Sequence, residues 1–201
     1  MAKVIILNAP PRSGKDKIAK LFEDHHGFPV VSFKRPMFNI ARGILGETAY
    51  QVFLNVYDSD LKDTRKLDML GGMTCREFMI WISEDIVKPK FGNKHFGWLM
   101  SEVLDEMSED CDTFICSDGG FPDEVEALID FSHEVHLIRM HREGFDFSND
   151  SRDYIYLTGQ YADKAHQHDI NLIDGNPEQA MRLISALVGA ESQEWKDDIP
   201  W

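Results

Sequence analysis

A glycine–lysine pair lies near the start of the chain, at Gly14 and Lys15, and an aspartate follows it directly. An apolar run at residues 4–7 precedes the pair, and apolar residues at helical spacing follow it. In such a strand–loop–helix context, backbone N–H groups surround an anion and the lysine reaches the outer phosphates. The pattern therefore predicts a nucleotide phosphate site with Lys15 as a catalytic cation. Its binding residues are predicted to be Ala9, Pro10, Pro11, Arg12, Ser13, Gly14, Lys15, Asp16 and Lys17.

This loop departs from the usual phosphate-loop pattern at two positions. Ala9 stands where the pattern has glycine, and Asp16 follows the lysine where the pattern has serine or threonine. An ordinary strand-to-helix turn is the alternative interpretation of the same residues.

Two carboxylates are candidates for holding Mg²⁺. Asp118 ends the apolar run at residues 113–117, where nucleotide-binding sheets carry the acid that contacts the metal. Asp16 replaces the usual hydroxyl ligand, and its carboxylate is suited to a metal-bound water. The alternatives are a turn cap after the strand for Asp118 and compensation of the helix N-terminal charge for Asp16.

Three arginines are candidates for compensating phosphate charge: Arg139, Arg142 and Arg152. Arg142 and Arg152 bracket a charged, glycine-containing stretch, residues 142–153, which resembles a short lid. Arginines on such a segment close over a triphosphate and keep their charge at any working pH. We therefore predict catalytic roles for Arg142 and Arg152, with surface pairing to nearby aspartates as the alternative. Arg139 lies inside a predicted strand, so it either is buried with a partner or points to the site.

A second anion-binding group follows the next predicted strand. Lys34 and Arg35 lie directly after the apolar residues 29–33, and Arg42 lies two turns further along a predicted helix. Arg76, near the start of a later helix, is a candidate to join them. We expect these four residues to contact the substrate; for each one alone, a solvated helix face is the alternative.

The elements that must position these residues alternate between strand and helix. Strands are predicted at residues 3–8, 29–33, 113–118, 134–141 and 170–173. Helices are predicted at residues 14–25, 35–57, 74–87, 95–108, 123–131, 154–165 and 177–188, with a break near Gly43 to Gly46. Such alternation is typical of an α/β fold in which two layers of helices cover a parallel sheet.

The length of 201 residues suits a single domain with its own hydrophobic core. We expect one domain over residues 1–201, with an acidic tail at residues 190–201 in which Trp195 and Trp201 are candidates to dock. Three cysteines without a disulfide framework indicate reduced thiols and a cytoplasmic protein. No stretch approaches membrane-spanning length, so no membrane partner is expected.

The net charge of −14 is unevenly distributed. Residues 102–126 hold ten acids and no lysine or arginine, whereas residues 1–45 hold eight basic residues against three acids. A cationic pocket is therefore compatible with an acidic protein. Broad nonspecific DNA binding is disfavoured, because it grows with the number of neutralised phosphates, but a local DNA contact stays open. The histidine pairs at 133/136 and 166/168 lack a third ligand at a supportive spacing, so no zinc site is predicted.

Taken together, these motifs resemble the phage deoxynucleoside monophosphate kinase group of P-loop kinases. The motifs are Pro-x-Ser-Gly-Lys-Asp at 11–16, Ser-Phe-Lys-x-Pro at 32–36, Arg-Glu-Phe at 76–78, Ile-Cys-Ser-Asp-x-x-Phe-x-x-Glu at 115–124 and Ile-Arg at 138–139. They follow the order of that group over about residues 3–140. The resemblance implies a three-layer P-loop kinase fold like that of adenylate kinases, ATP with Mg²⁺, a deoxynucleotide acceptor and, for a phage-encoded chain, the host cytoplasm.

The chain departs from this group at two positions. The group has arginine two residues after the strand-end acid, where this chain has Gly120, and threonine after Gly-Lys-Asp, where it has Lys17. A related phage group, which phosphorylates 5-hydroxymethyluracil already in DNA during thymine hypermodification, resembles the chain similarly and makes DNA a candidate substrate. For such a hydroxyl acceptor, Asp118, Glu84 or Asp85 is a candidate base. Other small-molecule acceptors and a nucleotide-binding protein without transfer activity are further alternatives; base specificity and oligomeric state stay open.

Overall fold

The computed structural model describes residues 1–148, 150 and 152–190, so the predicted acidic tail with Trp195 and Trp201 lies outside the described residues. The chain divides into two compact units. We call them the sheet unit, which is Met1–Ser32 with the chain from Gly97 onward, and the helical unit, Phe33–Phe96. A single domain over the whole chain stays a prediction.

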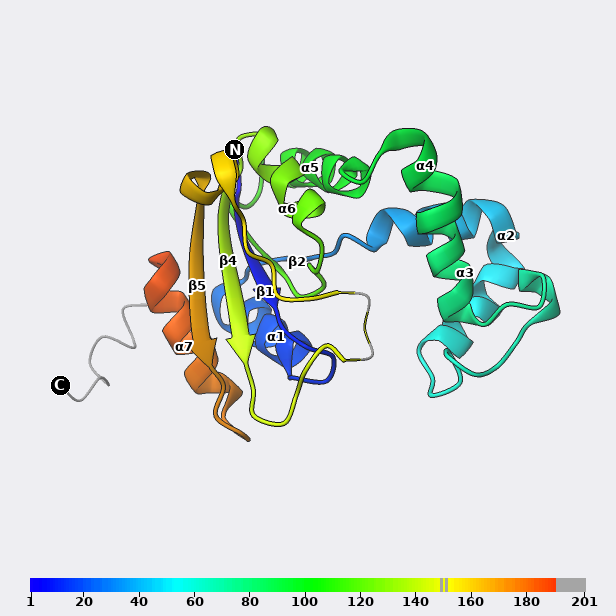
Figure 1. Ribbon diagram of the computed structural model, residues 1–201, viewed down its shortest axis with the longest axis horizontal. Helices are drawn as coiled ribbons and strands as arrows, with labels where there is room; N and C mark the ends of the chain where they lie inside the picture. Colours follow the sequence, from blue (N-terminus) through cyan, green and yellow to red (C-terminus); the bar gives the residue numbers. More distant parts are fainter. Residues whose placement is uncertain (149, 151, 191–201) are drawn as a thin grey trace. The chain divides into compact units, whose positions relative to one another are not determined.

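Five parallel strands in the order β2-β3-β1-β4-β5 form the sheet unit's centre (Figure 1). The strands are β1 Lys3–Asn8, β2 Val30–Val31, β3 Thr113–Cys116, β4 Glu134–His141 and β5 Ala165–Asn171. The three central strands are almost wholly buried because both faces of a parallel sheet are covered; β1 and β3 are mostly apolar, whereas β4 also carries the buried polar residues His136 and Arg139. The predicted α/β class is confirmed.

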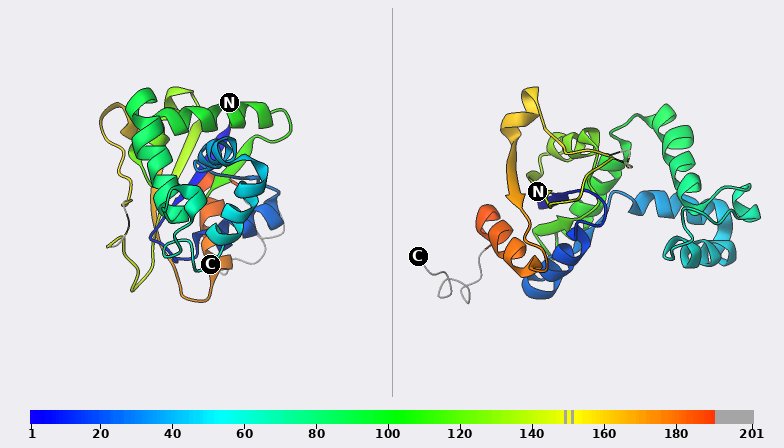
Figure 2. Two further views of the ribbon diagram at one scale, coloured as in Figure 1. Left: turned by 90° about the vertical axis from the view of Figure 1, so that its right-hand side faces the viewer. Right: turned by 60° about the horizontal axis from the view of Figure 1, so that its bottom comes forward.

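Two pairs of helices cover this sheet (Figures 1 and 2). The helices α1 Lys15–His26 and α7 Pro177–Val188 pack on one face, where their apolar residues share a core with Leu7 of β1 and Ile138 of β4. Successive residues of a strand point to opposite faces of the sheet, so Ile6 of β1 points away from α1 and α7. The helices α5 His95–Met107 and α6 Pro122–Asp130 lie on that other face. The sheet unit therefore has three layers.

The helical unit lies between β2 and α5 in the chain. Its elements are α2 Arg35–Tyr57, the 3₁₀-helix η1 Asp68–Leu70, α3 Cys75–Trp81, the π-helix η2 Ile82–Val87 and α4 Lys88–Phe91. The predicted break in α2 is present at Gly46, where φ is 69°. A capping box begins α3: Thr74 Oγ1 accepts from the Glu77 N–H at 3.2 Å, and Glu77 Oε2 accepts from the Thr74 N–H at 2.8 Å.

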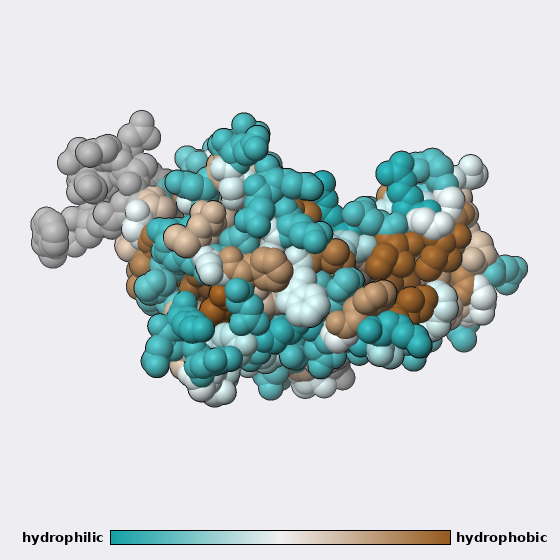
Figure 3. Space-filling view, turned by 90° about the horizontal axis from the view of Figure 1, so that it is seen from above, coloured by the Kyte–Doolittle hydropathy of each residue, from teal (hydrophilic) through white to brown (hydrophobic). Residues whose placement is uncertain are grey.

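Aromatic residues form much of the helical unit's core. Phe53 is fully buried, and the rings of Phe38 and Phe78 pack against it. Hydrophobic side chains also reach the surface of this unit, visible on the right of Figure 3. The large hydrophobic side chains that are exposed here are Ile44, Val52, Leu61, Ile80 and Phe91. Within the described residues, no helix is both long and apolar enough to cross a membrane.

The chain after the predicted lid differs from expectation. Residues 154–158 are extended and Gly159–Lys164 forms the 3₁₀-helix η3, so the predicted helix in this region is wrong. Ile155 and Leu157 are buried and the tyrosine before each is more exposed, which is the two-residue period of an extended segment. As a result β5 begins at Ala165, earlier than the predicted strand.

Arg139 of β4 holds this extended segment in place. Its side chain is buried and forms two bonds with Asp169, Nε to Oδ1 at 3.0 Å and Nη2 to Oδ2 at 2.6 Å. Its Nη1 donates to the carbonyl oxygen of Ile155 at 3.0 Å and to Oε1 of Gln167 at 3.1 Å. Of the two alternatives for Arg139, burial with a partner is therefore the one observed.

The Arg139–Asp169 pair predicts a loss of stability in acid. Hydrogen bonds from the Arg139 guanidinium lower the pKa of Asp169 from 3.8 to about 2. Because the folded-state pKa is the lower one, this stabilisation is complete above about pH 4 and is lost as the pH falls towards 2. We expect the urea-unfolding free energy of the wild type to fall over this range more steeply than that of Asp169→Asn. A wild-type advantage that stays constant down to about pH 2.5 would contradict this assignment.

Candidate active site

The carboxyl ends of all five strands deliver polar residues to one end of the sheet. β1 leads into the phosphate loop, β3 into Ser117 and Asp118, and β4 into Arg142. Ser32 follows β2, and residues 172–176 follow β5. Ligands of open parallel sheets bind at this end of the strands. Residues predicted from separate motifs thus share one location in the sheet unit.

The phosphate loop, residues 9–14, turns between β1 and α1 with left-handed backbone at two positions. Arg12 has φ 62° and Gly14 has φ 101°. Such positions among right-handed ones form concave groups of N–H donors that bind anions. Any side chain at Gly14 would be strained, and the glycine leaves α1 without a side-chain cap. The first turn of α1 therefore offers its N–H groups and its positive dipole end to an anion.

Lys15 and Ser13 supply side-chain donors to this loop. Lys15 is 7% exposed, and its Nζ donates to the carbonyl oxygen of Pro10 at 3.2 Å, so the side chain folds back along the loop. Ser13 Oγ is buried and has no hydrogen-bond partner among the described residues. A buried ammonium and an unsatisfied hydroxyl fit a bound phosphate, which accepts from both.

Each of the two predicted metal carboxylates accepts a hydrogen bond from a different serine. Ser117 Oγ donates to Asp16 Oδ1 at 2.7 Å, and Ser32 Oγ donates to Asp118 Oδ2 at 2.5 Å. Cys116 Sγ also donates to Asp118 Oδ1, at 3.1 Å; burial raises the pKa of this thiol, which keeps it a donor. Two carboxylates beside hydroxyls form an oxygen donor set that fits Mg²⁺. Metal binding by Asp16 and Asp118 stays a prediction.

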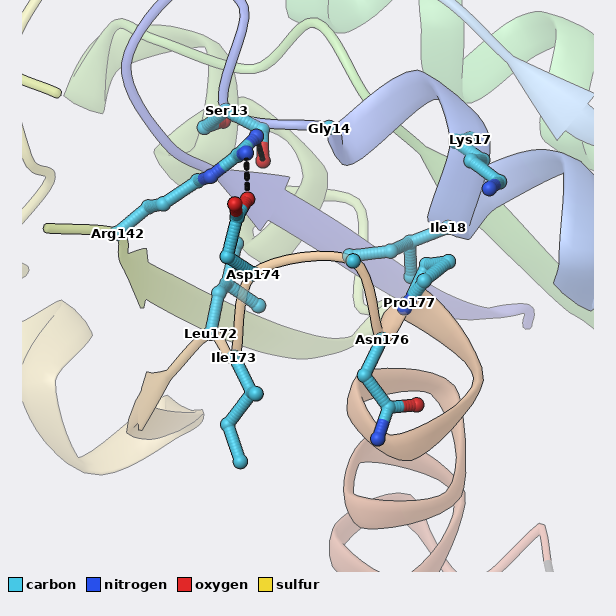
Figure 4. Close-up of a pocket in the computed structure, with 11 residues that line it drawn as sticks. Ser13, Gly14, Lys17, Ile18, Arg142, Leu172, Ile173, Asp174, Asn176 and Pro177 are labelled. Atoms are coloured by element: carbon cyan, nitrogen blue, oxygen red, sulfur yellow. Dashed lines mark hydrogen bonds and ion pairs between the residues drawn. The ribbon is translucent and has the colours of Figure 1, made fainter.

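Arg142 lies against the phosphate loop. Its Nη1 donates to the carbonyl oxygens of Arg12 and Ser13 at 3.4 and 3.3 Å, and its Nη2 forms an ion pair with Asp174 (Figure 4). The guanidinium also stacks on the ring of Phe145, 4.4 Å from the ring centroid. The guanidinium of Arg142 therefore lies beside the phosphate loop, where part of it is paired with an aspartate, and a catalytic role for Arg142 stays a prediction.

A cavity of about 270 Å³ opens beside Arg142. It lies between the start of α1 and the turn that joins β5 to α7 (Figure 4). Its apolar walls are Ile18, Leu172, Ile173 and Pro177. Apolar walls with a few polar groups are typical of small-molecule sites. The β5–α7 turn was not predicted to take part; the signal was its place after a strand, next to the helix start at Asn176 and Pro177.

Arg152 lies over Gly120. A Cβ on Gly120 would be 2.3 Å from Cδ and 2.5 Å from Cγ of Arg152, so only glycine leaves room for this side chain. The guanidinium donates to both carboxylate oxygens of Asp150, Nε at 2.8 Å and Nη2 at 2.7 Å. These hydrogen bonds, together with the charges of Asp118 and Glu124, raise the pKa of Arg152. The alternative prediction for Arg152, pairing with a nearby aspartate, is therefore the one observed. The pair lies near the carboxylates of Asp118 and Glu124.

Asn8 fixes the segment that carries Arg152. This last residue of β1 is fully buried, and its Oδ1 accepts from the Ile155 N–H at 2.9 Å. Its Nδ2 donates to the carbonyl oxygens of Asp153 at 3.1 Å and Gly119 at 3.4 Å. Sequence reasoning missed Asn8, and the available signal was a single amide at the end of an otherwise apolar strand.

Alanine at position 120 is expected to displace Arg152, because the new methyl group would overlap its stem. We expect Gly120→Ala to lower kcat by about 10- to 100-fold, the effect of misplacing a charged group by about 1 Å. Gly43→Ala is the matched control, since a Cβ there meets nothing within 4 Å. Activity assays with both variants check this, and equal activities would show that Arg152 does not need its place over Gly120.

The four predicted substrate residues all belong to the helical unit. Lys34 immediately precedes α2, and Arg35 is its exposed first residue. Arg42 pairs with Glu47, Nε to Oε2 at 2.7 Å, and Arg76 lies 3.8 Å from Asp63; all four of these paired side chains are about half exposed. The phosphate loop belongs to the sheet unit. Substrate binding by Lys34, Arg35, Arg42 and Arg76 stays a prediction.

Comparisons with known proteins identify the fold. The chain is similar to the structure of a sugar kinase from Janibacter sp. HTCC2649, with a TM-score of 0.52 and 11% identity over 94% of this chain and 95% of that one. It is also similar to a shikimate kinase from Aquifex aeolicus vf5 (TM-score 0.43, 14% identity, 92% and 96% covered). A dephospho-CoA kinase from Campylobacter jejuni has a TM-score of 0.46 and 15% identity, with 94% and 100% covered.

Neither a protein-family model nor a curated protein sequence matches this chain. The similarity to the sugar kinase, at 11% identity, concerns the fold and not the substrate. Together with the parallel sheet and its two layers of helices, it shows a three-layer α/β fold like that of this kinase structure. None of the three named kinases is described as acting on deoxynucleotides.

Proposed function

We propose that this protein transfers the γ-phosphoryl group of ATP to a deoxynucleoside monophosphate. The observation that carries this proposal is the meeting of three features at the carboxyl end of one sheet. These are a phosphate loop with a buried lysine, two carboxylates that each accept a hydrogen bond from a serine, and an arginine against the loop. Phosphoryl transfer requires the corresponding three contributions: positioning of phosphates, a divalent metal and compensation of negative charge.

The donor nucleotide is assigned to the loop and to the cavity beside it. The N–H groups at the start of α1 bind phosphate oxygens, and Lys15 exchanges its bond with the Pro10 carbonyl for one to an outer phosphate. The apolar cavity beside Arg142 adjoins the loop, so it is suited to the base of the same nucleotide. Arg142 then gives up its ion pair with Asp174 and faces the phosphates.

Asp16 and Asp118 are the residues that would hold Mg²⁺, directly or through water. When bound, Mg²⁺ neutralises charge on the phosphate oxygens during transfer. Ser117 and Ser32 hold the two carboxylates in fixed orientations, so little reorganisation is needed when the nucleotide enters.

Arg152 supports a monophosphate as the acceptor. The resembling kinases carry an arginine where this chain has Gly120, and here the side chain of Arg152 occupies the space over that glycine. A guanidinium is thus supplied near Asp118 from a later segment of the chain. The missing arginine at position 120 therefore does not argue against a phosphorylated acceptor.

A second acceptor is the hydroxymethyl group of 5-hydroxymethyluracil in DNA. The observation that favours it is the pairing of Arg152 with Asp150, whose side chain is only 3% exposed. A guanidinium held in this way is less available to a monophosphate, whereas a hydroxyl acceptor needs no such contact. Asp118, Glu84 and Asp85 are then the candidates for the base that accepts the hydroxyl proton.

A labelled-phosphate screen separates these functions. The full-length protein is incubated with Mg²⁺, γ-labelled ATP and each of the four deoxynucleoside monophosphates, hydroxymethyl-dUMP, or hydroxymethyluracil-containing DNA. We expect label in a nucleoside diphosphate. Label only in DNA supports the second acceptor, and an absence of transfer to every acceptor, with ATP bound, contradicts both.

A further inference from the structure

Four titratable side chains gather at the amino ends of β4 and β5, away from the carboxyl ends that form the candidate active site. The strand register pairs His136 with His166 and Ile138 with His168. Alternate residues of a strand share a face, so Glu134, His136, His166 and His168 belong to the same face of the sheet. Two neighbouring strands thus contribute potential metal ligands at matching positions.

Three of these side chains are close enough together to bind a single metal ion. Glu134, His136 and His166 each offer one ligand atom, and these atoms lie within 4.8 Å of one another. Nε2 of His136 is 2.8 Å from Oε1 of Glu134, and the rings of His136 and His166 stack with their centroids 4.5 Å apart. Glu134 is therefore the third ligand that histidine spacing alone did not reveal.

Two ring nitrogens in this cluster are buried without a hydrogen-bond partner in the described part of the chain, Nδ1 of His136 and Nε2 of His168. His136 itself is only 5% exposed. Buried polar atoms normally have partners, so these two nitrogens leave the cluster incompletely hydrogen-bonded.

We propose that Glu134, His136 and His166 bind one divalent transition-metal ion, and that Zn²⁺ suits this donor set best. Two imidazoles and a carboxylate are a donor set found in zinc sites, with a fourth position left to water or another ligand. Bonds of about 2.0–2.2 Å require the ligand atoms to approach to about 3.4 Å of one another. The exposed ring of His166 is free to move by up to about 1.4 Å and to turn out of its stack with His136, so that its lone pair faces the metal. The metal would replace the hydrogen bond between His136 and Glu134, and the displaced ring proton would move to the other ring nitrogen or to solvent.

Replacing Lys3 is expected to change the metal affinity in the opposite direction to replacing a ligand. Its Nζ lies 3.5 Å from Oε1 of Glu134 and also donates to the carbonyl oxygen of Val188 at 3.0 Å. The ammonium partly neutralises the carboxylate that the metal would bind. Removing it in Lys3→Met is therefore expected to raise the metal affinity, whereas removing a ligand lowers it.

Zinc titration of the tag-free, full-length protein against a chromophoric chelator measures this affinity. We expect one Zn²⁺ at the cluster, an affinity about 100-fold lower in His136→Ala and in His166→Ala, and a higher affinity in Lys3→Met. His25→Ala is the matched control, because His25 is an exposed histidine on α1 outside the cluster. The visible absorption of bound Co²⁺ gives a second readout that reports nitrogen ligation directly.

Zinc also binds to carboxylates such as the predicted Mg²⁺ ligands, so Asp118→Asn is titrated as well. We expect this variant to keep the wild-type Zn²⁺ affinity. Unchanged affinity in both histidine variants, loss of affinity in Asp118→Asn instead, or no stoichiometric binding at all would each overturn the proposal. Because the titration does not involve phosphoryl transfer, its outcome is independent of the proposed kinase activity.

Discussion

Replacing Lys15 with alanine is expected to lower kcat for phosphoryl transfer by about 1,000-fold. The Lys15 ammonium is buried beside the loop, where its charge is weakly screened. During transfer, negative charge spreads over the oxygens of the moving phosphoryl group, and this ammonium compensates it. Alanine is the best helix former at this first position of α1, so the loss concerns catalysis more than folding.

The matched control for Lys15→Ala is Lys20→Ala on the same helix. Lys20 is exposed and pairs with Glu23 and Asp24 on the solvent side. Turnover of ATP with the identified acceptor is measured for both variants, and thermal unfolding verifies that both are folded. A Lys15→Ala protein that retains most of the wild-type kcat contradicts the kinase proposal. Full biological activity of Lys15→Ala, with no phosphoryl transfer detected in the wild type, would support the alternative of a nucleotide-binding protein without transfer activity.

Asp118→Asn is expected to lower kcat by about 100-fold and to raise the Mg²⁺ concentration needed for half-maximal activity. Asparagine has the same shape and its amide oxygen still accepts from Ser32 Oγ, so the negative charge is lost together with only one hydrogen bond, the one from Cys116 Sγ. A neutral amide is a poorer ligand than a carboxylate for a small divalent cation. The change in Mg²⁺ dependence is the part of this result that a structural role alone would not produce.

Asp112→Asn is the matched control for this variant, because Asp112 lies just before the amino end of the same strand, β3. Its exposed carboxylate accepts from Thr113 Oγ1 at 2.9 Å. Asp112 lies at the opposite end of β3 from Asp118. Mg²⁺ titrations of the activity are compared for the wild type and both variants. The metal assignment of Asp118 fails if the two variants share the wild-type Mg²⁺ dependence.

The parts of the site that depend on local sequence were predictable. Gly14 and Lys15 act within one turn of chain, so an apolar run before them and helical spacing after them were enough to locate the loop. Asp118 was predictable because a polar residue at the end of a buried strand must leave the sheet there. The order of strands and helices likewise indicated the α/β class.

The parts that depend on distant partners were not predictable. Arg139 pairs with Asp169 on the neighbouring strand, and a single sequence does not reveal which acid its guanidinium meets. Gly120 was interpreted as a missing arginine, while the structure uses the absence of a side chain there to seat Arg152. The extended segment and the 3₁₀-helix after the lid were predicted as one helix. The tyrosines before Ile155 and Leu157 hid the alternation of buried and exposed residues that is typical of extended chain.

The strand register also determines the order in which this chain can fold during synthesis. Lys3 of β1 pairs with Thr113 of β3 and Glu134 of β4, so β1 is made long before either neighbour. The contiguous helical unit, Phe33–Phe96, is complete while β1 still has both edges unpaired. Unpaired apolar strands associate with one another. Nascent chains that stop before Glu134 are therefore expected to aggregate.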